Sequence, residues 1–361
     1  MPIDELLHKE TFTKDDLVAL LSLQGDDMQQ LFKKALEVKI AHVGRKVYFR
    51  GLIEYSNRCS KNCYYCGIRS GNKKFSRYEM TDEEVIEAAM YAYQHQFASI
   101  VIQSGERSNQ RFTRKIESLL KEICRLTHGE MHVTLSLGEQ TEETYRRWFD
   151  AGAHRYLLRI EASNEQLYPK LHPADGKHDY QKRLEALRTL RRLGYQVGTG
   201  VMIGLPFQTL SDLADDLLFF RDFDVDMIGM GPYIEHEETP LYKYRDQLPP
   251  LKERLDLSLK MVAILRIMMK DINIAATTAM QAIDPQGREK ALMAGANVMM
   301  PNLTPVKYRD EYLLYENKPC LDEAADQCRG CLETRILLSN HEVGYGEWGD
   351  SAHYQKRKKE E

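Results

Sequence analysis

The sequence lacks any long apolar run. Nothing in it approaches the roughly 18 consecutive apolar residues that a membrane-spanning helix needs. Residues 1–10 are charged and lack the apolar core of a secretory signal peptide. We therefore expect no membrane association and a cytoplasmic location.

The chain also carries little net charge. Its 50 Lys and Arg residues nearly balance 54 Asp and Glu residues, which leaves a formal net charge of -4 over 361 residues. A near-neutral protein has no electrostatic basis for binding nucleic acid or a membrane surface. We expect small-molecule partners and no nucleic acid.

Cysteine is scarce, but six of the seven cysteines fall in two short groups. The groups are Cys59, Cys63 and Cys66, spaced C-x3-C-x2-C, and Cys320, Cys328 and Cys331, spaced C-x7-C-x2-C. Tight groups are typical of metal ligands in a reducing compartment, not of a secreted disulfide framework. The seventh, Cys124, lies in a helical pattern, and we expect a buried core thiol.

The first cysteine group has too few ligands for a closed metal site. A 4Fe-4S cluster normally takes four thiolates, so three protein ligands leave one iron free for a small molecule. A zinc knuckle is the alternative, but structural zinc sites want four Cys or His ligands, and the loop contains no His. The spacing therefore favours an iron–sulfur cluster with one open iron.

Strand and helix patterns alternate from residue 47 onward. The expected strands cover residues 47–55, 98–104, 132–137, 155–161, 197–203, 226–231, 272–278 and 296–300. Eight such units predict an α/β fold, a closed (β/α)8 TIM barrel with its active site at the carboxyl ends of the strands. A doubly wound open sheet is the alternative, but neither a GxGxxG motif nor a P-loop supports it.

The barrel is expected to have an extension at each end. Residues 1–45 are predicted to be an N-terminal helical extension, in which Thr13 and Asp16 resemble a capping box. Residues 46–305 form the barrel. Residues 306–361 form a C-terminal extension with the second cysteine group and a charged tail, residues 355–361, which we expect to be solvated and disordered.

The fourth expected strand places charge inside the barrel. Side chains alternate along a strand, so Arg155, Arg159 and Glu161 share one face, and that face cannot pack under helices. Buried charges need partners, which are either one another or a polar ligand. Polar residues on neighbouring strands point to the same interior: Gln103, Thr134, Ser136, Thr277 and Thr278. We favour a polar ligand in a cavity.

The first cysteine group has an aromatic residue before its last cysteine and resembles the signature of the radical S-adenosylmethionine (SAM) enzymes. The resemblance implies a 4Fe-4S cluster on Cys59, Cys63 and Cys66, with SAM chelating the open iron. It also implies reductive cleavage of SAM to methionine and a 5′-deoxyadenosyl radical.

A second resemblance is more specific and covers residues 45–335. The segments that show it are residues 103–106, 134–139, 155–161, 204–206, 276–280 and 295–302. They resemble the HydE-type FeFe-hydrogenase maturases. This implies a radical that acts on an iron–dicarbonyl–cyanide precursor with a cysteine ligand, during assembly of the hydrogenase diiron site. It also implies an external one-electron donor and other hydrogenase maturation proteins as partners.

The resemblance assigns site residues as well. Its SAM-binding positions are Tyr65, Gly105, Thr134, Ser136, Glu161, Arg183, Met202, Met230, Gly231 and Pro232. Among these, Gly105 meets the methionyl amino group, Arg183 grips the methionyl carboxylate, and Glu161 accepts from the ribose. An interior anion or substrate site is implied at Arg50, Gln103, Arg155, Arg159, Thr277, Thr278 and Tyr308.

The second cysteine group holds three thiolates, including a C-x2-C pair. Such a group can bind a further iron–sulfur cluster or zinc. The resemblance implies a peripheral 2Fe-2S or 4Fe-4S cluster on Cys320, Cys328 and Cys331.

Two other functions remain open on the sequence. A radical SAM enzyme acting on a carbon substrate, like 3-methylornithine synthase or biotin synthase, would share the fold and the SAM site. A non-catalytic iron–sulfur scaffold or electron carrier would use both cysteine groups as a relay.

Overall fold

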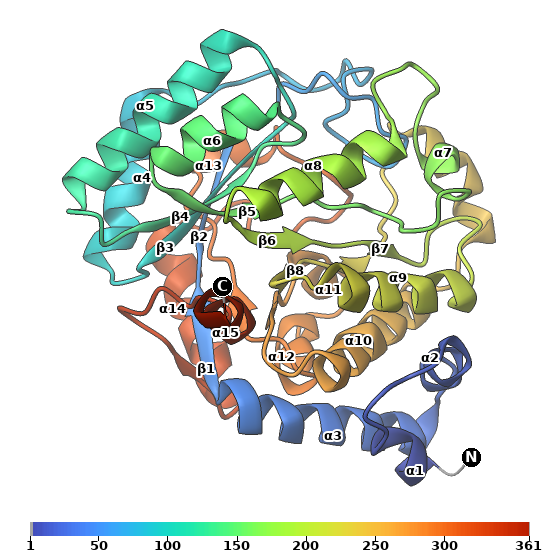
Figure 1. Cartoon of the computed structure of the whole chain (residues 1–361). Helices are drawn as coiled ribbons and strands as arrows, with labels where there is room; N and C mark the ends of the chain where they lie inside the picture. Colours follow the sequence, from blue (N-terminus) through green and yellow to red (C-terminus); the bar gives the residue numbers. More distant parts are fainter. Residues whose placement is uncertain (1–2, 361) are drawn as a thin grey trace.

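The computed structural model describes residues 3–360, and a ring of parallel strands forms its centre (Figure 1). Seven strands make one sheet in the order β10-β8-β6-β5-β4-β3-β2. They are β2 (Gly51–Ser56), β3 (Ser99–Ser104), β4 (His132–Ser136), β5 (Ala153–Leu157), β6 (Gln196–Thr199), β8 (Met227–Ile228) and β10 (Asn273–Ile274). Every neighbouring pair is parallel, as strand–helix–strand units require.

An eighth strand, β11 (Val298–Met299), closes the ring. On one side the Asn297 amide donates to the carbonyl of Ile274, at the end of β10. On the other side β11 pairs with β1 (Lys46–Phe49), which continues into β2 after Arg50. The prediction of a closed (β/α)8 barrel is confirmed, and the open sheet was the wrong alternative.

Helices surround the ring and bury its outer face (Figure 1). They are α4 (Asp82–Gln94), α5 (Gln110–Leu126), α6 (Glu142–Asp150), α8 (Tyr180–Arg192), α9 (Leu210–Phe223), α10 (Leu251–Met268), α11 (Thr278–Ile283) and α12 (Gly287–Met293). Thr81 and Thr209 begin α4 and α9 with capping boxes, which satisfy backbone amides that would otherwise lack partners. None of the helices in residues 3–360 combines the length and apolar content needed to cross a bilayer.

Several short elements lie above the barrel or between its units. They are α7 (Tyr168–Leu171), β7 (Met202–Ile203), β9 (Gly231–Pro232), the 3-10 helix Pro240–Gln247 and α13 (Val306–Arg309). The strands β7 and β9 pair with each other beyond the ends of β6 and β8. They therefore extend the wall of the barrel at its carboxyl end.

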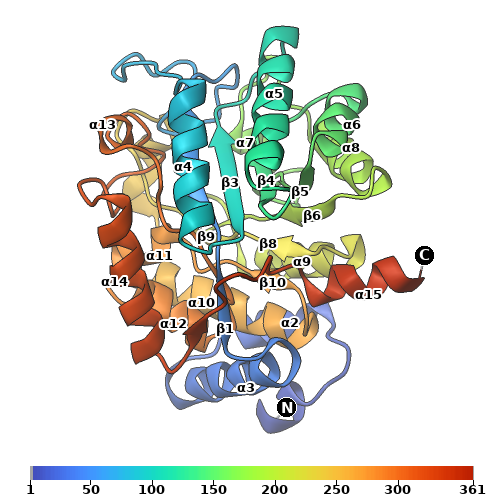
Figure 2. The ribbon, with the colours of Figure 1, turned by 90° about the vertical axis from the view of Figure 1, so that its left-hand side faces the viewer.

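The N-terminal segment packs outside the barrel (Figure 2). It forms α1 (Ile3–Leu7), α2 (Lys14–Leu21) and α3 (Gly25–Val43). Helix α2 lies on α9 and α3 lies on α10. The predicted capping box is present, since the Thr13 hydroxyl accepts from the amide of Asp16 and the Asp16 carboxylate accepts from the amide of Thr13.

The C-terminal segment returns to the opposite end of the barrel, where the strands begin, which we call the floor. After α14 (Ala325–Leu338), strand β12 (Glu342–Val343) pairs with β1. Residues 344–351, the floor segment, then cross beneath the strands. The fully buried Arg155 donates to Asp350 at 2.5 Å, and Asn273 donates to the carbonyl of Gly349 at 2.8 Å. The C-terminal residues therefore cover this end of the barrel.

The expectation of a disordered tail was wrong, although most residues of the run 355–360 are exposed as expected. Residues Ala352–Glu360 form the helix α15 (Figure 2), and ion pairs anchor it to the barrel. Arg357 contacts Asp226 at 2.7 Å, and His353 lies between Asp224 at 2.5 Å and Asp271 at 3.1 Å. Charge complementarity with carboxylates of the barrel, from the buried Asp226 to the exposed Asp224, explains why this cationic segment folds onto it.

The anchoring of α15 should depend on pH. Its hydrogen bonds to Asp271 raise the pKa of His353, with Asp224 adding to the effect. A raised pKa gives stability that is complete below the ordinary pKa of about 6.5 and is lost as pH rises through the folded value. Lys356, Arg357 and Arg191 face the same carboxylates but keep their charge over this range.

We expect the melting temperature of the native protein to fall more than that of His353→Gln between pH 6 and pH 9. The difference should correspond to about 1 kcal/mol or less, because the site is partly exposed. Differential scanning fluorimetry measures both. Parallel curves for the two proteins would rule out His353 as the source of the pH dependence.

Candidate active site

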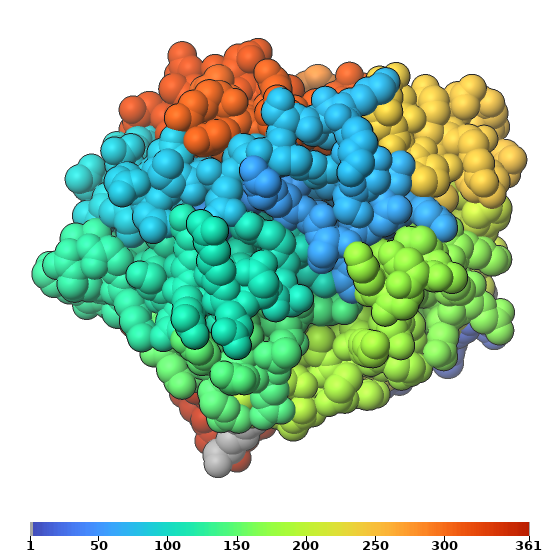
Figure 3. All heavy atoms as spheres, turned by 90° about the horizontal axis from the view of Figure 1, so that it is seen from above, coloured from blue at the N-terminus to red at the C-terminus, as the bar shows by residue number. Residues whose placement is uncertain are grey.

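A cavity of about 340 Å³ opens at the carboxyl ends of the strands. Its wall includes Gln103 and Ser104 at the end of β3, Ser136 at the end of β4 and Leu157 at the end of β5. Figure 3 looks down on this end, where segments from several distant parts of the chain meet. The cavity thus occupies the place that the barrel predicts for an active site.

The cysteine loop follows β2 and forms one side of this cavity. Cys59, Cys63 and Cys66 all lie in its wall. A Cβ atom added to Gly105 would lie 2.5 Å from the carbonyl oxygen of Arg58 and 2.7 Å from the Cβ of Cys59. Only glycine therefore lets the end of β3 approach the loop this closely.

The three loop cysteines do not lose their thiol protons readily on their own. Burial raises the pKa of Cys59, raises that of Cys63 to about 12, and raises that of Cys66 well above its ordinary value. A thiolate in this place needs a nearby positive charge, which a metal centre supplies. Three inward thiols in one wall suit a metal cluster better than they suit thiol chemistry.

A group of four charges stands beside the loop. Arg183 binds Glu139 at 2.7 Å, and Lys61 binds Glu139 at 3.0 Å and Glu106 at 3.3 Å. All four side chains are largely buried. Lys61 was missed by the sequence analysis, although its position between the first two loop cysteines was a possible signal. The group offers both signs of charge to a zwitterionic ligand.

Beyond the end of β5, Glu161 and Arg159 form an ion pair of 3.0 Å. Glu161 has a positive φ of 67°, because β5 ends at Leu157 and the chain turns there. Burial raises the pKa of the Glu161 carboxyl. Arg159 Nε is buried and has no hydrogen-bond partner among residues 3–360. This unpaired donor suits a polar ligand in the cavity.

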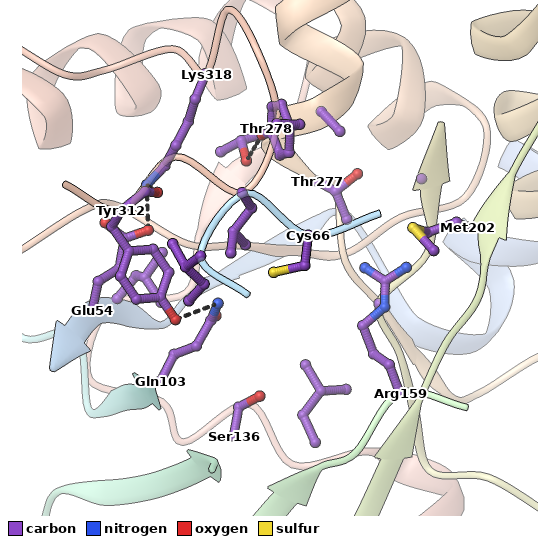
Figure 4. A pocket seen from close by; sticks show the side chains of 18 of the residues that line it. Glu54, Cys66, Gln103, Ser136, Arg159, Met202, Thr277, Thr278, Tyr312 and Lys318 are labelled. Atoms are coloured by element: carbon purple, nitrogen blue, oxygen red, sulfur yellow. Dashed lines mark hydrogen bonds and ion pairs between the residues drawn. The ribbon is translucent and has the colours of Figure 1, made fainter. Parts of the chain in front are cut away.

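Most of the expected binding residues reach the cavity (Figure 4). Those in its wall are Tyr65, Gly105, Ser136, Glu161, Arg183, Met202, Gly231, Pro232, Gln103, Arg159, Thr277 and Thr278. Thr134 and Met230 are buried behind the wall instead. Thr134 precedes Ser136, which lines the cavity, by two residues of β4, and Met230 packs in the core between Gly229 and Gly231, which both line the cavity.

Three expected substrate residues lie elsewhere, and their placement in the substrate site was wrong. Arg50 and Arg155 point into the barrel, but at its floor, where they bind the carbonyl of Gly349 and the carboxylate of Asp350. Tyr308 donates to Glu84 at 2.9 Å and stacks on Tyr78 outside the barrel.

The cavity wall also includes charged residues that the sequence analysis did not single out. Lys318 binds Glu54 at 2.5 Å and donates to the carbonyl of Tyr312 at 3.0 Å (Figure 4). Glu54 and Lys318 are separated by 264 positions. The sequence could have indicated this ion pair through Glu54, because a carboxylate inside an apolar strand requires a partner.

The structure splits the second cysteine group. Cys320 and Cys328 lie in the cavity wall, and their sulfur atoms and a Glu323 oxygen lie within 4.8 Å of one another. Cys331, one turn further along α14, is exposed and outside this cluster. Cys124 is also exposed on α5, so the expectation of a buried core thiol was wrong.

Comparisons with known proteins agree with this geometry. Residues 53–220 match the profile of the Radical SAM superfamily. The chain is 45% identical over 346 residues to the FeFe hydrogenase maturase subunit HydE of Thermotoga maritima, a match that covers 96% of this chain and 95% of that protein. It is 26% identical over 311 residues to 3-methylornithine synthase of Methanosarcina barkeri, covering 84% and 83% of the two chains.

Solved structures show the same fold. Methylornithine synthase (PylB) superposes with a TM-score of 0.79 at 22% identity, covering 95% of this chain and 97% of that one. The hydrogenase maturase HydG superposes with a TM-score of 0.77 at 20% identity, covering 95% and 75%. The near full-length sequence match is the more specific result: the chain belongs to the radical SAM superfamily and, within it, to the HydE-type FeFe-hydrogenase maturases.

Proposed function

We propose that this radical SAM maturase modifies an iron–dicarbonyl–cyanide precursor that carries a cysteine ligand, as a step in building the FeFe-hydrogenase diiron site. The observation that carries the proposal is the shared cavity, in which three loop cysteines face a wall of polar and cationic side chains. A 4Fe-4S cluster with SAM on its open iron would supply a 5′-deoxyadenosyl radical on reduction by an external one-electron donor.

The residues near the loop fit SAM. Cys59, Cys63 and Cys66 would hold the cluster. Arg183 has the geometry to bind the methionyl carboxylate in exchange for part of its contact with Glu139, because a guanidinium matches a carboxylate with two parallel hydrogen bonds. Glu161 would accept hydrogen bonds from the ribose. The other proposed SAM contacts are Tyr65, Gly105, Ser136, Met202, Gly231 and Pro232.

The deeper wall fits an anionic substrate. Arg159 adds positive charge, while Gln103, Thr277 and Thr278 add hydrogen-bonding groups (Figure 4). Leu157, Leu158 and other apolar residues complete the wall. Apolar walls exclude water, which keeps a reactive carbon radical for its target.

We also propose a second iron–sulfur cluster, 2Fe-2S or 4Fe-4S, at the second cysteine group. Cys320 and Cys328 support it by their proximity, and Cys331 lies one helical turn from Cys328. Glu323 offers a further oxygen ligand beside them. The other maturation proteins remain expected partners.

Hydrogenase activation tests the proposal directly. The anaerobically reconstituted protein is mixed with SAM, dithionite and the synthetic iron complex, and 5′-deoxyadenosine is measured by liquid chromatography. The same protein is added to an extract that contains the other maturation proteins and hydrogenase apoprotein. We expect the iron complex to stimulate SAM cleavage and the extract to gain hydrogenase activity.

A carbon substrate is the second candidate, because the chain is also 26% identical to a 3-methylornithine synthase. If the enzyme acts on a carbon substrate, it should cleave SAM without activating the hydrogenase. If the extract gains no activity while an amino-acid substrate stimulates 5′-deoxyadenosine formation, the maturase proposal is wrong.

The proposed role of Glu161 gives a separate prediction. We expect Glu161→Ala to weaken SAM binding about tenfold or more, since a hydrogen bond to a charged group contributes about 1.5–3 kcal/mol. Equilibrium dialysis with the reconstituted protein measures it. The matched control is Glu165→Ala, a nearby carboxylate that is exposed and outside the wall. Equal affinity in the two variants would show that Glu161 does not contact SAM.

A further inference from the structure

One buried carboxylate of the barrel has no positive partner. Five Asp and Glu side chains within residues 3–360 are buried. Four of them bind a cation, namely Asp16 with Lys9, Glu54 with Lys318, Asp226 with Arg357 and Asp271 with Lys356. The fifth, Asp216 on α9, is 1% exposed, and no Lys, Arg or His of residues 3–360 pairs with it. Its burial therefore carries a cost that an ion pair offsets at the other four positions.

The two oxygens of the Asp216 carboxyl differ in their contacts. Oδ1 accepts from the backbone amide of Ser163 at 2.8 Å and from the Ser163 hydroxyl at 2.6 Å. Oδ2 is buried and has no hydrogen-bond partner in the described part of the chain. Burial raises the pKa of Asp216 to about 7, and the like charges of Asp212 and Asp215 add to the effect. Hydrogen bonding to one residue, Ser163, is thus what offsets the burial of this carboxyl.

Ser163 lies two residues after Glu161, whose backbone is strained. The φ of Glu161 is 67°, in the left-handed region that residues other than glycine rarely adopt. Such a conformation persists only where the surrounding contacts fix it. The Glu161 amide donates to the carbonyl of Gly200 at 3.0 Å, and its own carbonyl accepts from the amide of Met202 at 3.2 Å. These bonds fix Glu161 itself, and Asp216 fixes the chain just after it.

Two further side chains hold the same turn. Tyr180 on α8 donates to the carbonyl of Ser163 at 2.7 Å, and Asn164 donates to Asp212 at 2.5 Å. Asp212 and Asp216 are four positions apart, on one face of α9. Of these two carboxylates, only Asp216 binds the backbone of the turn. It therefore fixes the path of the chain and not only the direction of a side chain.

We infer that Asp216 is a positioning residue for SAM binding, which acts through Ser163 to hold the carboxylate of Glu161 in the cavity wall. The inference rests on the proposed function, since it is there that Glu161 accepts hydrogen bonds from the ribose of SAM. Asp216 itself lies outside the wall. Without its hold on Ser163, the turn would relax toward an ordinary φ, and the carboxylate of Glu161 would no longer be directed at the ribose.

The acceptor oxygen of Asp216, and not its charge, should determine the affinity for SAM. Asp216→Ala removes the acceptor, whereas Asp216→Asn keeps an acceptor oxygen that cannot ionise. We expect Asp216→Ala to bind SAM about fivefold more weakly than the native protein, and Asp216→Asn to bind it as the native protein does. Equilibrium dialysis with the reconstituted proteins measures both. The control is Asp215→Ala, which removes a partly exposed carboxylate of the same helix that binds Lys14 instead.

A double variant separates positioning from a general loss of structure. If Asp216 acts through Glu161, Asp216→Ala should weaken SAM binding in the native background but not in the Glu161→Ala background. The apoprotein gives a second readout, because the amide of Ser163 should exchange its hydrogen faster in Asp216→Ala than in Asp216→Asn. Hydrogen exchange is followed by mass spectrometry. The inference is overturned if the two substitutions weaken SAM binding additively, if Asp216→Ala binds as the native protein does, or if Asp216→Asn is as weak as Asp216→Ala.

Ser163→Ala keeps the test decisive if Asp216→Ala does not fold. This variant removes one of the two hydrogen bonds to Asp216, so we expect it to bind SAM about twofold more weakly, and only while Glu161 is present. Native affinity in Ser163→Ala would then overturn the inference, as would native affinity in Glu161→Ala. A failure of the proposed function gives a different pattern, in which the iron complex does not stimulate SAM cleavage although the affinities for SAM change as expected.

Discussion

A Cys63→Ala variant should form no more 5′-deoxyadenosine than a protein-free blank, even after anaerobic reconstitution with SAM and dithionite. Cys63 lies in the cavity wall between the other two loop cysteines in sequence, and all three are partly buried. A 4Fe-4S cluster with three protein ligands already has one open iron. Removing another ligand would expose a second iron and leave the cluster on two thiolates, too few to hold it in place.

Cys124→Ala is the matched control, because Cys124 is a single exposed thiol on α5, far along the chain from the loop. Iron content and the visible absorption of the cluster are recorded for both variants beside SAM cleavage. We expect Cys124→Ala to behave as the native protein. If Cys63→Ala retains iron at the native level and still cleaves SAM, the loop cysteines do not hold the catalytic cluster.

An Arg155→Met variant should lose stability, with little effect on SAM cleavage per folded molecule. Arg155 is fully buried and donates to Asp350, Ser99 and the carbonyl of Trp348. Removing one partner of a buried ion pair leaves the other charge uncompensated, which costs about 3–5 kcal/mol. Denaturant unfolding of the apoprotein measures the change.

A second substitution checks the cause. Adding Asp350→Asn to Arg155→Met removes the charge left behind, so the double variant should be more stable than the single one. A single variant of native stability that no longer responds to the iron complex would instead place Arg155 in the substrate site, against the geometry of the floor. The two measurements thus separate a structural role from a binding role.

The same strand shows how far sequence reasoning could go. Alternation correctly predicted that Arg155 and Arg159 point into the barrel. Alternation does not say how far along the barrel a side chain lies, and four residues span roughly 13 Å of strand. Arg159 therefore reaches the cavity while Arg155 reaches the floor. The partner of Arg155 lies 195 positions away, in a segment with no strand or motif to reveal it.

Local patterns predicted the elements well, and long-range pairing explains the errors. The repeated strand–helix units and the cysteine spacing depend on neighbours in sequence, and the barrel and the loop were found where they were expected. Tyr308 was misplaced because its partner, Glu84, is 224 positions away. Lys318 was missed for a similar reason, since a single lysine in a loop does not reveal which part of the cavity wall it will join.

The floor segment has a consequence for how the protein is made. Residues 344–351 cover this end of the barrel, yet every barrel strand precedes them in the chain. A ribosome therefore releases all eight strands before the residues that close the floor have left the exit tunnel. Until then Arg50, Arg155 and Asn273 lack their final acceptors, and water can enter from below. Residues 344–351 thus join the barrel last, and their docking against Arg155 and Asn273 is the final step in assembling its floor.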